Sequence, residues 1–454
     1  MKIYLREIKE RFPEFEIRNY DENAFFIGFN HDSRTIKQNE IFIPIVGDKF
    51  DGHDFILQSL QAGASVSLCE SKKSLLIKDA AKPIVLVDSI EEGLQKLLNF
   101  SISPITAPII AITGSTGKTT TRQMLTTVLS EDGSVLTTDN ANTVWGNANL
   151  LSQYVDEKYI ALECGMDRAG EIAWHVNSVD PDLGILLNVG DVHAEKLGSI
   201  ENIYEEKKNL ADYLNKTGKP LVLNVDDNRL IRILKDSKAE IITFGKNEYA
   251  NFKISNVIVG QEGTDFVLTV EMVDYNIHLN TFGEGLVYDA VAAIAAANKL
   301  GLSIEMCIKG IQKFLPNNGR FEIVKLNDED IIINDAYNAN PASMDMSLRT
   351  FAILYPKDVY YRIAVLGDMK ELGDVSSEKH MELGELAKSL EFNEVYFLGE
   401  YFKDFNYGIE IKSIGDIVGI LAEKMSKTTQ KIAILCKGSH STQLYEIPTL
   451  LQKI

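Results

Sequence analysis

The sequence is poor in cysteine and in basic residues, and it has no long uninterrupted apolar run. Four cysteines occur in 454 residues, far apart at Cys69, Cys164, Cys307 and Cys436. Thiols this sparse exclude a disulfide scaffold, and no pair has the spacing of a zinc site, so we expect a cytoplasmic protein. No apolar stretch reaches the length of about 18 residues that a membrane-spanning helix needs.

The shortage of basic residues also limits the partners. Lysine and arginine number 46 against 65 aspartates and glutamates, which gives a net charge of -19 at pH 7. A nucleic-acid partner requires a basic surface, so this charge argues against such a partner. An anionic small-molecule substrate stays compatible with this charge, because a local pocket can be basic within an acidic protein.

What the chain does contain is an alternation of apolar strands with amphipathic helices. Fully apolar strands separated by helices indicate an α/β protein whose parallel sheets are covered on both faces. Turn-rich segments at 101–108 and 314–324 divide the chain into three predicted domains, 1–103, 104–315 and 316–454. We expect the central domain to carry a phosphate loop on a parallel sheet, and the last domain to be Rossmann-like.

The most informative stretch is "IIAITGSTGKTTTRQML", residues 109–125. An apolar strand enters a glycine- and threonine-rich turn and leaves as a helix, so backbone N–H groups and the helix N-terminus can hold phosphate oxygens. Lys118 would bring positive charge to the β- and γ-phosphates, and the Thr119 hydroxyl could bind Mg²⁺. The usual pattern has a glycine where this chain has Ile112, so a tight turn of chance composition is the alternative. ATPases, kinases and ligases all use such loops.

Two other strand ends carry polar side chains. Glu163 ends the strand "YIALE", and His193 follows the strand in "LGILLNVGDV". Side chains there reach the ligand crevice of a parallel sheet, and with Thr119 they could hold Mg²⁺. Taken alone, a glutamate at a strand end is more often a solvated surface group, and a single histidine is more often a packed or surface residue. Lys207, within "EEKK", is explained as one charge of an exposed helix face.

A third strand end lies in "INDAYNANPASM", residues 333–344. Asp335 ends this strand, where a carboxylate can accept hydrogen bonds from ribose hydroxyls. The alternative is an Asx-turn that closes the strand.

Taken together, these motifs resemble the Mur ligase family, ATP-dependent amide-forming enzymes of cell-wall precursor synthesis. The segments that carry the resemblance follow in the family's order: "DSRTIKQNEIFIPIVGDKFDGHDF" (32–55), "TGSTGKTT" (113–120), "ECGMDRAGEIA" (163–173), "NVGDVHAEKLGSIENIYEEK" (188–207), Gly319-Arg320, "NDAYNANPASM" (334–344), "VLGDMKELGD" (365–374) and "KGSHS" (437–441).

The resemblance implies three domains, for a UDP-sugar, for ATP, and for closure over ATP and the amine substrate. It implies that Lys118 contacts the γ-phosphate and that Lys207 is carbamylated by CO₂. It assigns the other roles as follows: Mg²⁺ to Thr119, Glu163, His193 and carbamylated Lys207; nucleotide to Gly114, Ser115, Thr116, Gly117, Thr120, Arg320, Asp335 and Asn338; and substrate to Ser33, Arg34, Asn142 and Thr143.

The implied reaction joins D-alanyl-D-alanine to a UDP-N-acetylmuramoyl tripeptide through an acyl phosphate, by a protein expected to be monomeric. Some positions depart from the family's pattern: Trp145 and Asn147 after the "NT" pair, Gly285, Leu286 and Asp289 before the alanine-rich helix, and His440 in the last motif. These departures leave two alternatives open. One is a sister ligase with another substrate, such as a pseudomurein-type ligase, and the other is a degenerate Mur-like binding subunit.

Overall fold

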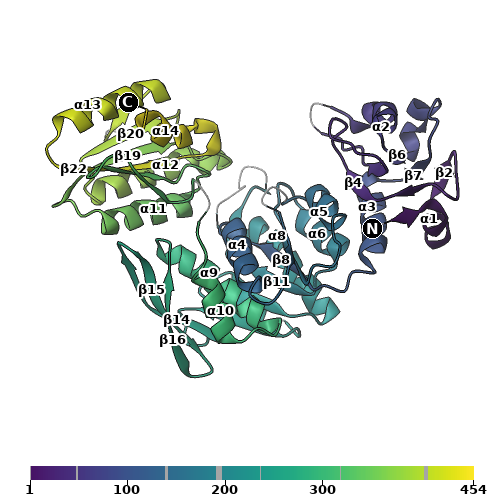
Figure 1. Cartoon of the computed structure of the whole chain (residues 1–454), viewed down its shortest axis with the longest axis horizontal. Helices are drawn as coiled ribbons and strands as arrows, with labels where there is room; N and C mark the ends of the chain where they lie inside the picture. Colours follow the sequence, from purple (N-terminus) through teal and green to yellow (C-terminus); the bar gives the residue numbers. More distant parts are fainter. Residues whose placement is uncertain are drawn as a thin grey trace. The chain divides into compact units, whose positions relative to one another are not determined.

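The structure is a computed structural model that describes residues 2–47, 50–138, 142–190, 197–235, 237–316, 319–402 and 407–453. The described residues form a two-stranded, a five-stranded, a nine-stranded and a six-stranded sheet, with helices between the strands (Figure 1). The predicted α/β class is therefore confirmed. Within the described part of the chain, no helix has both the length and the apolar character needed to cross a membrane.

The chain divides into two compact units. The first comprises Met1–Thr113, Asp132–Gly184 and Asn209–Pro220, and the second comprises Gly114–Glu131, Ile185–Lys208 and Leu221–Ile454. The boundaries expected near residues 103 and 315 stay a prediction.

The N-terminal region builds the five-stranded sheet in the order β2-β7-β6-β5-β4. Its strands are β2 (Glu16–Arg18), β4 (Gly28–Asn30), β5 (Glu40–Phe42), β6 (Val66–Glu70) and β7 (Ile84–Val87), and its helices are α1 (Leu5–Arg11), α2 (Ile56–Ala62) and α3 (Ile90–Ile102); β1 (Ile3–Tyr4) and β3 (Phe25–Phe26) form the two-stranded sheet. Strands β4 to β7 are parallel, and β2 is antiparallel to β7. Ser89 is the N-cap residue of α3, although its side chain makes no capping hydrogen bond.

The central region builds the nine-stranded sheet in the order β16-β15-β14-β13-β12-β11-β8-β10-β9. Its strands are β8 (Ile109–Thr113), β9 (Val135–Leu136), β10 (Tyr159–Glu163), β11 (Leu183–Leu186), β12 (Leu221–Asn224), β13 (Ile241–Gly245), β14 (Phe252–Gly260), β15 (Gly263–Val270) and β16 (Val273–Leu279). Its helices are α4 (Lys118–Leu129), α5 (Val144–Leu151), α6 (Glu171–Val179), α8 (Ile200–Thr217), α9 (Glu284–Lys299) and α10 (Ile304–Ile311). Of the last three strands, β15 lies between β14 and β16 and is antiparallel to both.

Burial explains why the apolar runs form the middle of this sheet. Every residue of β8 and β10 is buried, as expected for parallel strands covered on both faces. Helix α9 is buried nearly all round, with Ala290 and Ala292–Ala297 among its buried residues. Small side chains let it pack closely against α4 and strands β12 to β15, which fixes the start of α4 relative to α9.

The C-terminal region builds the six-stranded sheet in the order β17-β18-β22-β19-β20-β21. Its strands are β17 (Glu322–Lys325), β18 (Ile331–Asn334), β19 (Tyr360–Gly367), β20 (Glu394–Leu398), β21 (Ile409–Glu410) and β22 (Lys431–Lys437), and its helices are α11 (Pro341–Leu354), α12 (Ser376–Ser389), α13 (Ile414–Lys427) and α14 (Ile447–Leu451). Alternate residues of β19 enter two separate cores: Ala364 and Leu366 pack with α11 and α12, whereas Ile363 and Val365 pack with α13 and α14. Helices therefore cover both faces of this sheet.

Candidate active site

The predicted phosphate loop lies between β8 and α4, as the sequence indicates. Gly117 precedes the first residue of α4 with φ +84°, in the left-handed region that favours glycine. A Cβ built on Gly117 would lie 2.3 Å from Oδ1 of Asp289, so the α9 carboxyl group packs directly against the junction of loop and helix. The N-terminus of α4 directs its backbone N–H groups and its positive dipole end toward this loop.

Asn188, which the sequence reasoning did not select, holds the loop in place. Its Oδ1 accepts a hydrogen bond from the Thr116 N–H at 2.9 Å, and its carbonyl accepts one from the Ser115 N–H at 3.1 Å. The Ser115 hydroxyl in turn accepts from the Gly190 N–H at 2.8 Å. Hydrogen bonds from Ser115 and Thr116 thus attach the loop to the segment after β11. In the sequence, only the position of Asn188 at the end of a predicted strand pointed to this role.

The two lysines expected at this site differ in exposure. Lys118 is partly buried, and its Nζ donates to the Gly114 carbonyl at 2.7 Å. Lys207, on α8, is 1% exposed. Burial, and then the charge of Lys118, hold the pKa of the Lys207 ammonium well below its ordinary value. The interpretation of Lys207 as one charge of an exposed helix face is therefore wrong.

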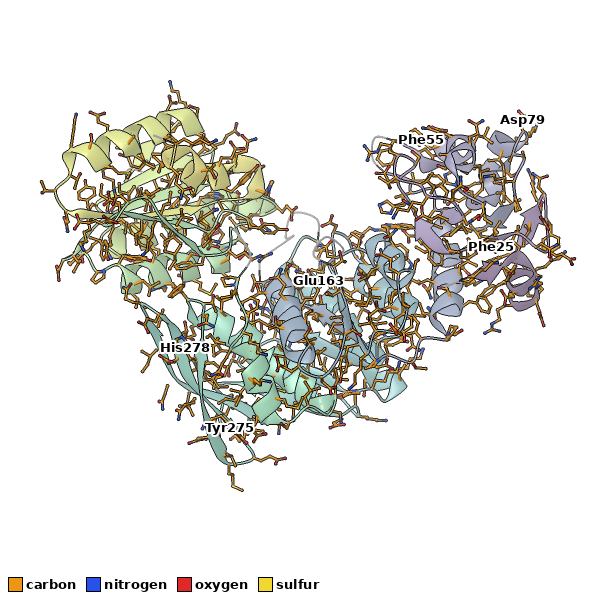
Figure 2. The ribbon with its side chains drawn as sticks, viewed as in Figure 1. Phe25, Phe55, Asp79, Glu163, Tyr275 and His278 are labelled. Carbon is orange, nitrogen blue, oxygen red and sulfur yellow. The ribbon has the colours of Figure 1, made fainter. Side chains whose placement is uncertain are left out.

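Glu163 lies at the carboxyl end of β10, and Figure 2 shows it at the upper margin of the central region. Its side chain is buried, with the residue 5% exposed. The Asn147 side chain donates to the Glu163 carbonyl at 2.9 Å and lies 3.4 Å from Nδ1 of His175. Burial lowers the pKa of His175 to about 4, so this histidine is neutral near pH 7. A neutral buried network thus supports the strand end that carries Glu163.

The remaining predicted residues of the first unit shape two loops. Arg34 folds back onto Asp32 in a bidentate ion pair of 2.8 and 2.7 Å, and these bonds hold the pKa of Asp32 at about 2. Ser33 lies between them in the same loop. Asn142 accepts the Gly165 N–H through its carbonyl at 2.8 Å, and Thr143 caps α5 through its hydroxyl, which accepts from the Gly146 N–H at 3.2 Å.

The predicted residues of the C-terminal region lie together at the carboxyl ends of β18 and β22. Asp335 accepts the Lys437 ammonium at 2.7 Å and the Phe321 N–H at 3.0 Å, and it also accepts the Ser347 hydroxyl. Because these donors come from other segments, Asp335 is not explained as a local Asx-turn. The Arg320 guanidinium lies 4.4 Å from the centre of the Tyr337 ring. The Asn338 carbonyl accepts from Lys437 at 3.3 Å.

The site residues are divided between the two compact units. The first unit contains Ser33, Arg34, Asn142, Thr143 and Glu163, whereas the second contains the residues Gly114 to Thr120, Lys207, Arg320, Asp335 and Asn338. His193 lies outside the described residues. Within the described part of the chain, no group of three or more histidine, cysteine, aspartate or glutamate side chains could hold a metal ion.

Comparison with known proteins decides the family. A UDP-N-acetylmuramoyl-tripeptide–D-alanyl-D-alanine ligase of Bacillus subtilis (strain 168) is 30% identical over 383 residues, which are 84% of this chain and 81% of the relative. The chain belongs to the Mur ligase family. Three family models match it: "Mur ligase family, catalytic domain" at 26–101, "Mur ligase middle domain" at 112–297, and "Mur ligase, glutamate ligase domain" at 319–440.

Solved structures agree with this assignment to the Mur ligase family. MurF from Acinetobacter baumannii has a TM-score of 0.89 at 23% identity, with 100% of this chain and 99% of that chain covered, and so shares the fold. A MurF ligase from Thermotoga maritima, solved in complex with ADP, has a TM-score of 0.82 at 27% identity, with 94% and 97% covered. The family predicted from the sequence motifs is thus confirmed.

The structure gives a packing reason for two of the departures from the Mur ligase pattern. Trp145 contacts Trp174 of α6 in an edge-to-face arrangement, with ring centroids 4.8 Å apart. Asn147, two residues on, pairs with His175 of the same helix. Both departures therefore join α5 to α6. At Gly285, a Cβ would lie 2.3 Å from the Met346 sulfur, so a larger residue there would require that flexible side chain to move.

We predict that Gly117→Ala destabilises the protein by more than the cost of placing an alanine at a positive φ. An alanine at φ +84° costs about 1 kcal/mol, and its Cβ would also collide with Asp289. Gly170→Ala is the matched control, because Gly170 also precedes a helix, at φ +85°, with nothing within 4 Å of an added Cβ. Thermal unfolding should show a larger loss of Tm for Gly117→Ala. Equal losses would contradict the contact with Asp289.

Proposed function

We propose that this protein is an ATP-dependent ligase that joins D-alanyl-D-alanine to a UDP-N-acetylmuramoyl tripeptide in peptidoglycan precursor synthesis. The observation that carries the proposal is the 30% identity, over 84% of this chain, to the Bacillus subtilis ligase of that name. The phosphate loop before α4 supports the use of ATP, as does the likeness to a MurF ligase solved with ADP. We place the reaction in the cytoplasm and expect a monomer.

In this proposal the acceptor carboxylate attacks the γ-phosphorus of ATP, and ADP leaves. The amine nitrogen of the dipeptide then attacks the acyl carbon, phosphate leaves, and the nitrogen loses a proton. Such chemistry depends on positioning and charge neutralisation, which the loop and Lys118 can supply. Closure over the acyl phosphate would exclude water from it.

Thr119, Glu163 and His193 are the residues we propose for Mg²⁺. Mg²⁺, when bound, would neutralise charge on the β- and γ-phosphates. The Thr119 hydroxyl belongs to the first turn of α4. Glu163 presents a buried carboxylate at the end of β10, and β10 pairs directly with β8, the strand that leads into the loop. Hard oxygen ligands of this kind are those that Mg²⁺ prefers.

We propose that Lys207 is carbamylated and serves the same metal site. Its burial favours the neutral amine, and a neutral amine is the form that reacts with CO₂. The nitrogen forms a bond to the carbon of CO₂ and releases a proton, which gives a carbamate with two oxygen ligands. An unmodified ammonium would instead repel Mg²⁺.

The other substrate contacts complete the proposal. We assign Ser33 and Arg34 to the UDP-sugar, Asn142 and Thr143 to the acceptor, and Arg320, Asp335 and Asn338 to the nucleotide. Asp335 follows the carboxyl end of β18, next to the end of β22, and Arg320 lies in the segment before β17. Ligands of α/β sheets bind at the carboxyl ends of the strands. The three domains 1–103, 104–315 and 316–454 would hold the UDP-sugar, ATP and the amine respectively.

Steady-state kinetics test the proposal against its alternatives. With ATP and a UDP-muramoyl tripeptide, phosphate release should require D-alanyl-D-alanine and be much slower with single amino acids. If a single L-amino acid gave the higher kcat/KM, a sister ligase, such as a pseudomurein-type enzyme, would replace this assignment while the amide chemistry would stand. Binding of ATP with no release for any amine would favour a degenerate binding subunit. Equal release without an amine would indicate a simple ATPase.

A further inference from the structure

Asp289 is a buried carboxyl group that none of the proposed catalytic steps uses. It lies on α9, is 7% exposed, and packs its Oδ1 against Gly117 at the junction of the loop and α4. The Thr121 hydroxyl, inside the first turns of α4, donates to the same oxygen at 3.1 Å. The carboxyl group therefore lies directly behind the backbone that would hold the nucleotide's phosphates.

Burial is the main influence on the charge of Asp289. Burial raises its pKa to about 7, against the smaller opposing effects of the Thr121 hydrogen bond and the charge of Arg320. Arg320, before β17, is the cation whose charge lowers the pKa of Asp289. Other titratable groups on the elements in contact with α9, or on α9 itself, include Lys118 and Arg122 on α4, Glu284, Tyr288 and Lys299 on α9, Lys253 on β14 and Asp265 on β15, with Asp226 after β12. The Tyr288 hydroxyl donates to Asp226 at 2.7 Å, so it does not serve Asp289. Additional negative charge nearby would therefore favour the protonated form of Asp289.

Phosphates in the loop would supply that potential. Two like charges separated by a partly buried loop interact more strongly than in water, because the protein between them screens poorly. The repulsion disappears if the carboxyl group takes a proton, which leaves the Thr121 hydrogen bond intact. Resting on the proposed use of ATP, we propose that Asp289 is a positioning residue of the phosphate loop whose carboxyl group is protonated in the nucleotide complex, so that nucleotide binding takes up a proton.

Because binding takes up a proton, the affinity for nucleotide should fall as the pH rises. Below pH 6 the carboxyl group is already protonated in the free protein, and binding takes up almost no proton. Above pH 7 the free protein is ionised, so each pH unit weakens binding until the pKa of the complex is reached. We expect the affinity for MgADP to fall about tenfold between pH 6 and pH 8 relative to a variant that cannot ionise.

Calorimetric titration of the full chain with MgADP, at pH 6, 7 and 8, tests the inference. Asp289→Asn removes the charge with almost no change of shape, and the nucleotide's own ionisation is common to both proteins. The ratio of the variant's affinity to the parent's should rise about tenfold from pH 6 to pH 8. At pH 8, titrations in two buffers of different ionisation enthalpy should show uptake of nearly one proton by the parent and of almost none by the variant.

Parallel pH profiles for parent and variant, or no proton uptake by the parent, would overturn the inference while leaving ATP use intact. If neither protein bound MgADP at any pH, the proposed function itself would fail, and the inference with it. Should Asp289→Asn not fold, the parent's proton uptake still decides the matter, and Thr121→Val provides a second variant. Loss of the Thr121 donor raises the pKa of Asp289, so the fall in affinity should move to higher pH; an unmoved profile would count against the inference.

Discussion

Lys118→Ala should lower phosphate release by about 10³-fold while the protein stays folded. Lys118 is the first residue of α4, and its ammonium already lies over the loop, 2.7 Å from the Gly114 carbonyl. Charge develops on the transferring phosphoryl group, so a preorganised cation there lowers the barrier far more than it stabilises the fold. Phosphate release with ATP, the UDP-muramoyl tripeptide and D-alanyl-D-alanine is the measurement.

Lys427→Ala is the matched control for this experiment. It removes one positive charge from an exposed i, i+4 pair with Glu423 on α13, and exposed pairs contribute little to stability. Its turnover should equal that of the parent. Near-normal turnover by a folded Lys118→Ala protein would remove the basis for assigning ATP to the loop.

The strands of the sheets could be predicted from the sequence because buried strands consist of short runs of apolar residues. The runs 109–112 and 221–223 are apolar without interruption, and in the structure all their residues are buried. The site residues at strand ends were predictable for the same reason, since a polar residue that follows such a run must lie at an edge of the sheet. Glu163 and Asp335 both occupy such ends.

Burial and contact over long sequence separations could not be predicted in this way. Lys207 lies in the charged run "EEKK", where helical charge patterning favours exposure, yet its side chain is buried. Asp289 was noticed only as a departure from the family's pattern. Its hydrogen bond to Thr121 spans 168 residues and depends on how α9 packs against α4. Trp145 and Asn147 were noticed in the same way, and only the structure reveals their partners on α6.

The burial of Lys207 leads to the last prediction, which concerns what this residue is chemically in the active enzyme. Lys207→Ala should lower phosphate release by about 10²-fold, as expected when a group that supports a metal site is removed. Lys207→Glu should retain part of the activity, because a glutamate also presents a carboxylate. Lys208→Ala, one residue further along α8, is the matched control, and its turnover should stay close to the parent's.

Dependence on CO₂ separates carbamylation from a purely structural role for Lys207. Removal of CO₂ should lower the parent's turnover, and bicarbonate should restore it, whereas the residual activity of Lys207→Glu should not respond to either treatment. In protein equilibrated with ¹³C-bicarbonate, NMR should detect a carbamate carbon in the parent and none in Lys207→Ala. Because a buried amine reacts with CO₂ only when neutral, the signal should weaken as the pH falls toward the lowered pKa of Lys207. An unmodified Lys207 amine in protein saturated with CO₂, Mg²⁺ and nucleotide would show that this buried lysine acts in another way.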